Sequence, residues 1–190
     1  MLAKVALGVT SAASVAAGTC AYRLFRQTRS DPLTGLGNRA ALVAAFNRAM
    51  RRGRGLVAVA VGDMNGFKAF NDVHGHRFGD QVLIAVASAL RTTATGRELP
   101  VRLHGDEFAV LLPQVSTPQQ AETRIRQFQA AVSSIAEIDG QPVEVGMSLG
   151  VMTAPVHTAQ LSALMVSADE RMYGDKHATR HHTRLATSHT

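Results

Sequence analysis

The sequence predicts an α/β (α+β) domain with a ferredoxin-like core of β-α-β-β-α-β order, with extra helices and a preceding N-terminal helix. Three observations point to this fold class. The chain of 190 residues has room for one domain and an appendage. Short apolar runs alternate with stretches of helical spacing. His104-Gly105 forms a tight turn between two of the apolar runs, as the β-β step of this plan requires.

A helix and then a buried strand open the predicted domain. Residues 31–32, Asp-Pro, start a turn, and Asn38 is a suitable N-cap for a helix that runs to about residue 52. Residues 56–61, LVAVAV, are a continuous apolar run, which is typical of a strand buried on both faces. The run stops just before Asp63, so a carboxylate closely follows the first strand.

The later elements follow from apolar spacing and from turn residues. A Thr-Pro pair at 117–118 places Pro at the first position of a helix. The predicted elements are a short helical piece at 67–75, a helix at 79–93, strands at 99–103 and 107–113, a helix at 118–138, a strand at 143–151 and a last helix at 161–176.

This order of elements predicts where carboxylates from different strands meet. A right-handed crossover makes the first two strands parallel, so the third strand runs opposite to both and lies between them. The end of the first strand and the start of the third then share one edge of the sheet. Asp63 lies at the first place, and Asp106 and Glu107 at the second. A lone Asp at a strand end is more often a turn residue, but carboxylates that converge need a cation, and hard Mg²⁺ takes one or two of them together with phosphate oxygens.

Composition narrows the range of partners. Lys and Arg number 20 against 14 Asp and Glu, which favours an anionic partner such as nucleotide phosphates, nucleic acid or a membrane surface. Cys20 is the only cysteine, so there is no intrachain disulfide and a reducing compartment is expected. With no Trp and two Tyr, the chain lacks the aromatic strands of a base-stacking module, so we expect no nucleic-acid partner.

Both ends of the chain differ from the domain between them. Residues 1–29 are predicted to form an apolar helix, because residues 5–22 carry no charge. The length of this uncharged segment is near the lower limit of the about 17–25 residues that a membrane-spanning helix needs. Three interpretations stay open: a membrane anchor with the following arginines on the cytoplasmic side, a dimerisation helix, and a cleaved signal peptide. With an anchor, the domain at 30–180 would be cytoplasmic and held at the inner face of the cell membrane. Residues 181–190 form a basic, His-rich tail.

Five stretches resemble successive motifs of the GGDEF domain family, the diguanylate cyclases, which make cyclic di-GMP from two GTP molecules. They are DPLTGLGNR (31–39), DMNGFKAFNDVHGHRFGD (63–80), RLHGDEF (102–108), MSLGV (147–151) and ADERMYGDKHATR (168–180). Five motifs in this order are far more specific than any one of them. The resemblance implies a palm-like nucleotidyl cyclase fold, GTP as substrate, release of pyrophosphate, and a homodimer in which each 3′-hydroxyl attacks the α-phosphate held by the other domain.

The resemblance also implies the catalytic and metal-binding residues. Asp63, Asp106 and the backbone carbonyl of Met64 would bind Mg²⁺, with Mn²⁺ as an alternative. Glu107 would accept the proton of the attacking 3′-hydroxyl or help to bind the metal. Lys68 would neutralise phosphate charge as it develops in the transition state.

Substrate contacts follow in the same way. Asn71 and Asp80 would read the edge of the guanine, and His76 would lie near the substrate. Lys176 and Arg180, four residues apart on the last helix, would contact the β- and γ-phosphates. Taken singly, each of these residues also suits a cap, a turn or a solvated surface.

Several positions depart from the family pattern. His104 replaces the first Gly of the hairpin motif, where Gly permits positive φ, so the alternative function is a catalytically inactive GGDEF-like domain that binds GTP and regulates a partner. Asn65 stands where a second Asp is usual, and Thr179 replaces a usual Gly. Thr95 and Glu98 replace the Arg and Asp of the inhibitory product site in this family. We therefore predict no inhibition by cyclic di-GMP through that site.

Overall fold

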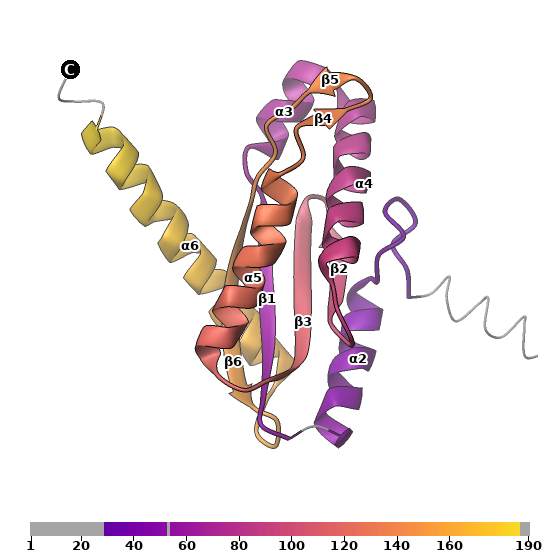
Figure 1. The fold of residues 1–190 in the computed structure, drawn as a ribbon, viewed down its shortest axis with the longest axis vertical. Helices are drawn as coiled ribbons and strands as arrows, with labels where there is room; N and C mark the ends of the chain where they lie inside the picture. The colour runs from indigo at the N-terminus through magenta and orange to yellow at the C-terminus, as the bar shows by residue number, and fades with distance from the viewer. Residues whose placement is uncertain (1–28, 53, 187–190) are drawn as a thin grey trace, which may run out of the picture.

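The structure is a computed structural model that describes residues 29–52 and 54–186, with the backbone alone for residues 52 and 175–186. A four-stranded sheet runs through it, and helices pack against the sheet (Figure 1). Its elements in chain order are α2 (Arg39–Arg52), β1 (Leu56–Met64), α3 (Phe67–His74), α4 (His76–Thr93), β2 (Leu99–His104), β3 (Glu107–Val115), α5 (Pro118–Ser133), β4 (Glu137–Ile138), β5 (Gln141–Pro142), β6 (Met147–Pro155) and α6 (Leu161–Ala186).

The sheet has the strand order β2-β3-β1-β6, and each neighbouring pair is antiparallel. β3 therefore lies between β1 and β2, which run in the same direction. The ferredoxin-like order predicted from the sequence is confirmed. As a result, the end of β1 and the start of β3 lie at one edge of the sheet.

Side chains of β1 alternate between two apolar cores. Ala58 and Ala60 belong to the core that α4 and α5 complete, whereas Val57 and Val59 belong to the core that α2 and α6 complete. All four side chains are fully buried. Burial on both faces explains why this strand is a continuous apolar run in the sequence.

Two helices begin where the sequence predicts, each after a capping side chain. The Asn38 side-chain oxygen accepts hydrogen bonds from the backbone N–H groups of Ala40 and Ala41, at 3.0 and 3.2 Å, and so caps α2. The Thr117 hydroxyl accepts one from the N–H of Gln120 at 3.1 Å and caps α5. Each cap satisfies backbone donors that have no partner within the helix.

The helix predicted over 118–138 is too long. α5 ends at Ser133, and residues 137–142 form a small hairpin from β4 and β5. The hairpin turns at Asp139-Gly140, whose φ angles are 49° and 77°. An Asp-Gly pair favours such a turn because both central residues need positive φ, and this local preference outweighs continuation of the helix.

Other predicted boundaries shift by a few residues. α4 begins at His76 rather than at residue 79, because Gly75, with φ of 82°, ends α3 and turns the chain directly into α4. The strand predicted at 143–151 is observed later, as β6, since it pairs with β1 along the whole length of that strand. The last helix continues beyond its predicted end, through to the end of α6.

The segment at 5–22, interpreted as a membrane anchor, a dimerisation helix or a signal peptide, lies outside the described residues, as does the end of the His-rich tail. Across the part of the chain that the structure describes, no helix combines the length and the apolar character needed to span a bilayer.

Candidate functional site

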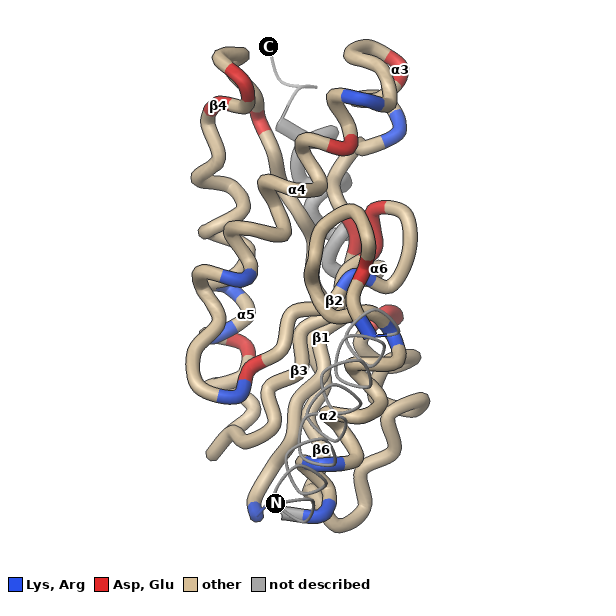
Figure 2. The backbone as a smooth tube through the Cα atoms, turned by 90° about the vertical axis from the view of Figure 1, so that its right-hand side faces the viewer, with Lys and Arg blue, Asp and Glu red and all other residues tan. Residues whose placement is uncertain are grey.

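A row of polar residues crosses all four strands at one end of the sheet. Asp63 on β1 is the register partner of Glu107 on β3 and of Ser148 on β6, and Glu107 is in turn the partner of His104 on β2. Residues directly opposite each other in an antiparallel pair point to the same face of the sheet. We call these four residues the rim row. Figure 2 shows acidic positions, in red, around the β2–β3 hairpin that carries half of it.

Asp106 joins this rim through the backbone. It lies in the turn between β2 and β3, and its carbonyl accepts a hydrogen bond from the N–H of Met64 at 3.3 Å. The turn is thereby attached to the end of β1. Asp63, Met64 and Asp106 are thus neighbours although they are distant in sequence, as the predicted strand order requires.

The donors at the rim suit a hard divalent cation. Carboxylate and carbonyl oxygens are the ligands that Mg²⁺ prefers, and Mg²⁺ usually takes only one or two carboxylates and completes its shell with phosphate oxygens and water. Among the described residues, no group of three or more His, Cys, Asp or Glu is arranged as a metal cluster. A site built from Asp63, Asp106 and a backbone carbonyl needs no such cluster, so the residues present fit a metal that binds together with a nucleotide.

The hairpin tip takes its left-handed residue from Gly105 and not from His104. Gly105 has φ of 50°, whereas among the described residues Asp139 alone has positive φ without being glycine. His104 ends β2 in extended pairing, and its Nε2 lies 3.2 Å from Oε2 of Glu107. The two side chains are 69% and 43% exposed, so this contact contributes little to stability. The backbone therefore does not require glycine at position 104.

These two neighbouring positions should respond differently to alanine. Gly105→Ala is expected to destabilise the fold by about 1 kcal/mol, because an L-residue pays roughly that much in the left-handed region. His104→Ala is expected to change stability by less than about 0.5 kcal/mol. Urea denaturation of both variants would measure this. A larger loss for His104→Ala would contradict the hairpin geometry.

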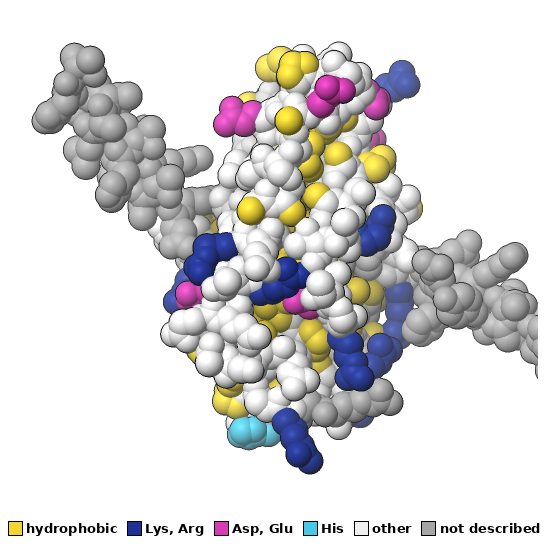
Figure 3. Space-filling model, in the orientation of Figure 1, with side chains coloured by type: hydrophobic (Ala, Val, Ile, Leu, Met, Phe, Trp, Pro, Cys, Tyr) yellow, Lys and Arg dark blue, Asp and Glu magenta, His cyan; other side chains and the backbone are white. Residues whose placement is uncertain are grey.

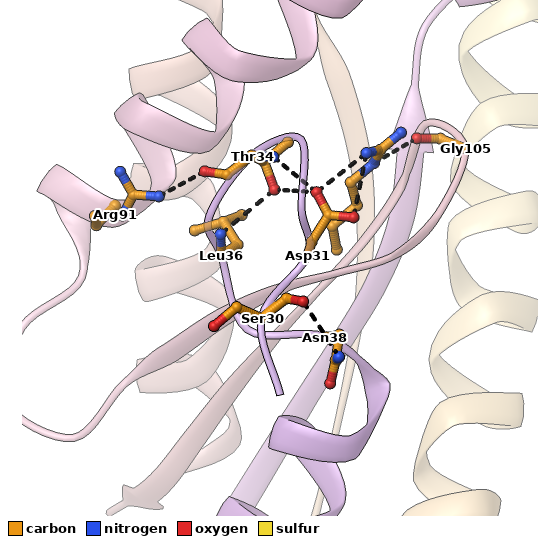
Figure 4. A network of polar contacts seen from close by, with 8 residues as sticks. Ser30, Asp31, Thr34, Leu36, Asn38, Arg91 and Gly105 are labelled. Carbon is orange, nitrogen blue, oxygen red and sulfur yellow. Dashed lines mark hydrogen bonds and ion pairs between the residues drawn. The ribbon is translucent and has the colours of Figure 1, made fainter. Parts of the chain in front are cut away.

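A polar network ties the start of the domain to the hairpin (Figure 4). Asp31 accepts hydrogen bonds from the N–H and hydroxyl of Thr34, at 2.8 and 2.6 Å, and pairs with Nη1 of Arg102 at 3.1 Å. Arg102 also donates through Nε to the carbonyl of Gly105 at 2.8 Å. Nη2 of Arg91 donates to the carbonyl of Thr34 at 2.7 Å. From the sequence, Asp31 is recognisable only as a turn residue, and this network is not predicted.

Hydrogen bonding determines the charge state of Asp31. Burial raises the pKa of its carboxyl, but hydrogen bonds from Thr34 and Arg102 outweigh burial and hold the pKa below its ordinary value. Asp31 and Arg102 are mostly buried, at 16% and 12% exposure, so the pair is shielded from solvent. The carboxylate is therefore a fixed anchor for the guanidinium that holds the hairpin tip.

The residues expected to bind guanine lie on α3 and α4. Asn71 is half-buried on α3, and its Oδ1 is a buried side-chain oxygen without a hydrogen-bond partner. His76 and Asp80 are exposed on the first turns of α4, and Lys68 is exposed on α3. The structure thus places these four side chains on two consecutive helices that follow β1 and its carboxylate.

Lys176 and Arg180 lie in the part of α6 for which only the backbone is described. Their predicted contacts with phosphate stay predictions. The helix that carries them is held against β6 through its earlier turns, where Arg171 donates to the carbonyl of Val151 at 3.3 Å.

Asn65 has a connecting role at the same end of the sheet. Its Oδ1 accepts a hydrogen bond from the hydroxyl of Ser148 at 2.8 Å, and its backbone N–H donates to the carbonyl of Gly146 at 2.9 Å. It therefore links the end of β1 to the start of β6. An amide serves this purpose as well as the Asp that is usual at this position.

Glu98 is engaged by an arginine from another element. Nη2 of Arg124 on α5 lies 2.7 Å from Oε2 of Glu98, and the backbone N–H of Thr95 donates to the same oxygen at 2.8 Å. Arg124 also stacks over the ring of Phe128, 4.7 Å from its centre. Burial raises the pKa of Glu98, but the hydrogen bonds from Arg124 and Thr95 outweigh it and hold the pKa below its ordinary value.

Acid should destabilise the fold through these two carboxyls. Because the folded state lowers the pKa of Asp31 and of Glu98, both stabilise the fold fully above their ordinary values of 3.8 and 4.5 and lose that effect as pH falls below them. We expect the melting temperature to fall steadily below about pH 4.5. Glu98→Gln should cost about 2 kcal/mol at pH 7 and show a weaker acid dependence. An unchanged dependence in this variant would exclude Glu98 as a cause.

A cavity of about 680 Å³ lies away from the rim, at the other end of β2 and β3. Arg48 from α2, together with Thr95, Arg97 and Glu98, contributes to its lining. Figure 3 shows dark blue side chains of Lys and Arg gathered over this lower right part of the molecule. Because the cavity is remote from the rim row, we do not assign it to the reaction.

The family model described as "Diguanylate cyclase, GGDEF domain" matches residues 28–182. The chain is 35% identical over 167 residues to diguanylate cyclase TpbB of Pseudomonas aeruginosa, an alignment that covers 86% of this chain and 38% of TpbB. The chain thus spans well under half the length of that curated relative.

Solved structures give the same result. The GGDEF domain of TpbB from Pseudomonas aeruginosa superposes with a TM-score of 0.71 at 35% identity, covering 78% of this chain and 89% of that one. The coiled coil and GGDEF domain of DgcB from Caulobacter crescentus, in complex with c-di-GMP, superposes with a TM-score of 0.80 at 25% identity, covering 94% and 96%. The palm-like nucleotidyl cyclase fold is therefore shared.

Proposed function

Because this chain belongs to the GGDEF family of diguanylate cyclases, we propose that it condenses two GTP molecules into cyclic di-GMP and releases pyrophosphate. The observation that carries the proposal is the rim, where Asp63 pairs in register with Glu107 beside the Asp106 turn. Acidic groups from separate strands meet there, at the end of the two central strands of the sheet, as metal-dependent nucleotidyl transfer requires.

The rim residues would divide the chemistry between them. Asp63, Asp106 and the carbonyl of Met64 would hold Mg²⁺ or Mn²⁺, which when bound supplies positive charge to the phosphate oxygens. Glu107 would accept the proton of the 3′-hydroxyl as that oxygen attacks the α-phosphorus and the bond to the β-phosphate breaks. Lys68 would offset the charge that develops on the phosphates.

Substrate recognition would come from the helices around the rim. Asn71 and Asp80 would read guanine, with His76 nearby, and Lys176 and Arg180 on α6 would contact the terminal phosphates. One domain holds one GTP, so two domains must face each other for both bonds to form. The active species is thus a homodimer, and the segment at 5–22 would raise the local concentration of domains by association or by membrane anchoring.

A second candidate is a GTP-binding domain without turnover. The observation that favours it is His104, whose contact with Glu107 competes for the carboxylate proposed as the base. Incubating the purified chain with GTP and Mg²⁺ separates the two functions. Cyclic di-GMP in the mixture supports the cyclase, GTP binding without product supports the silent domain, and binding of neither GTP nor metal contradicts both.

Product inhibition through the replaced site is not expected. Arg124 already neutralises Glu98, and Thr95 supplies no charge for a phosphate. Added cyclic di-GMP should therefore leave the initial rate within about twofold of the rate without it. This change is well under tenfold, the factor in a binding constant that corresponds to about 1.4 kcal/mol. Saturable inhibition that disappears in Arg48→Gln or Arg97→Gln would contradict this prediction, because both arginines line the cavity that also contains Thr95 and Glu98.

A further inference from the structure

The carboxamide of Asn71 occupies a niche that exists because residue 79 is glycine. A Cβ added to Gly79 would lie 1.9 Å from Oδ1 of Asn71 and 3.0 Å from its Cγ. Gly79 itself is buried on α4, and Asn71 is on α3, so the niche lies where the two helices meet. A methyl group and the present position of Asn71 therefore exclude each other.

The corner between the two helices is braced, so it cannot simply open. The N–H of Gly75 donates to the carbonyl of Asn71 at 2.8 Å, and the N–H of Gly79 donates to the carbonyl of Gly75 at 3.1 Å. The rings of Phe70 and Phe78 stack across the corner at 5.6 Å. A side chain at position 79 would thus displace Asn71 rather than part the helices.

The niche also determines which end of the carboxamide faces outward. Oδ1 is buried against Gly79 without a hydrogen-bond partner, and the amide nitrogen is farther from the added Cβ than Oδ1 and Cγ. The nitrogen, a donor, therefore lies on the side of the carboxamide away from Gly79, the side left for a ligand. Asp80, the residue that follows Gly79 on α4, is exposed and, when ionised, only accepts hydrogen bonds.

One donor and one acceptor on the same helix corner select between purines. Guanine presents an acceptor, O6, next to a donor, N1–H, whereas adenine presents the opposite order at these two positions. The pair formed by Asn71 and Asp80 matches guanine and opposes adenine. A site that leaves a polar group unpaired with the wrong base discriminates strongly against it.

We propose that Gly79 is a specificity-determining position of the nucleotide site, because its missing side chain holds the Asn71 carboxamide with the donor outward. This inference rests on the proposed function, in which Asn71 contacts guanine. Gly79 itself touches no substrate and acts through Asn71.

The test compares Gly79→Ala with the wild type in binding 3′-deoxy-GTP, which lacks the attacking hydroxyl and so cannot react, and 3′-deoxy-ATP. We expect Gly79→Ala to bind 3′-deoxy-GTP about tenfold more weakly, the loss of one hydrogen bond, while 3′-deoxy-ATP is unaffected. Gly174→Ala is the matched control, since it adds the same methyl to a helical glycine with nothing within 4 Å. It should bind like the wild type.

A double variant shows whether the effect passes through Asn71. Asn71→Ala removes the two closest contacts of the added methyl and leaves the end of the Phe67 side chain at 3.3 Å. Asn71→Ala and Asn71→Ala/Gly79→Ala should therefore bind 3′-deoxy-GTP equally. This pair also serves if Gly79→Ala alone fails to fold, because the double variant relieves the clash. The side-chain amide NMR signal of Asn71 should shift in Gly79→Ala without nucleotide.

The outcomes separate this inference from the proposed function. Wild-type binding of 3′-deoxy-GTP with unchanged binding by Gly79→Ala overturns the role of Gly79 and leaves the cyclase standing. If the double variant binds 3′-deoxy-GTP about tenfold more weakly than Asn71→Ala does, the role of Gly79 is overturned as well. A wild type that binds no 3′-deoxy-GTP at all overturns both.

Discussion

Asp63→Asn is expected to lower the rate of cyclic di-GMP formation by at least about a hundredfold, since even an outer partner of a bound metal is worth 10- to 100-fold and Asp63 is proposed as a direct ligand. The same holds for Asp106→Asn. Both changes keep the size of the side chain and remove its charge, so the strands that hold them should still pair. The measurement is product formed from GTP and Mg²⁺, alongside the melting temperature of each variant.

Asp72→Asn provides the matched control for this prediction. Asp72 is exposed on α3, is not one of the residues paired in register at the rim, and loses the same charge. Its rate should stay within about twofold of the wild type, as for an ordinary surface substitution. If Asp63→Asn and Asp72→Asn had equal rates, the rim would not be the reaction centre.

Gly150→Ala is expected to cost the largest structural penalty that we predict. An added Cβ on this β6 residue would lie 2.0 Å from the carbonyl oxygen of Ala168 and 2.5 Å from the backbone N of Met172, both on α6. These are backbone atoms, which cannot rotate away, so the helix must move. Overpacking of this kind costs about 1–3 kcal/mol or more, or about 5 °C in melting temperature for a domain of this size.

Gly150→Ala should also weaken the use of GTP, even at temperatures where the variant is fully folded. Displacing α6 at Met172 moves the later turns that carry Lys176 and Arg180, the residues proposed to hold the terminal phosphates. We expect the KM for GTP to rise about tenfold at a temperature where the variant is fully folded. Gly146→Ala is the control, because its methyl meets only the end of the Asn65 side chain at 3.2 Å. Equal melting temperatures for the two variants would contradict the close approach of α6 to β6.

Patterns that depend on chain order were predictable from the sequence. The strand order follows from the alternation of elements and from the handedness of crossovers, and it places Asp63 beside Glu107 without any coordinates. The caps at Asn38 and Thr117 are equally local, because a cap needs only its own side chain and the next few N–H groups. The β4–β5 hairpin was also readable, at Asp139-Gly140, and was missed because helical spacing was extended over it.

Features that depend on a neighbour from elsewhere in the chain were not predictable. Arg102 and Asp31 are 71 positions apart, and nothing in either motif marks them as partners. Gly79 and Gly150 look like any other glycines until the atoms that face them are known. Position 79 faces the carboxamide of Asn71 and position 150 faces the backbone of α6, so neither has room for a side chain. Both contacts form only when the chain packs.

The Asp31–Arg102 pair determines where this domain can be cut. A shortened chain that starts after residue 31 keeps every described strand and helix but removes Asp31. The guanidinium of Arg102, which is 12% exposed, then has no carboxylate partner at this position. Such a buried cation is costly, and the loss falls on the loop holding the carbonyl of Gly105. Fragments prepared for crystallisation or assay should therefore retain at least Ser30 and Asp31, because fragments without them will be less stable than the intact domain.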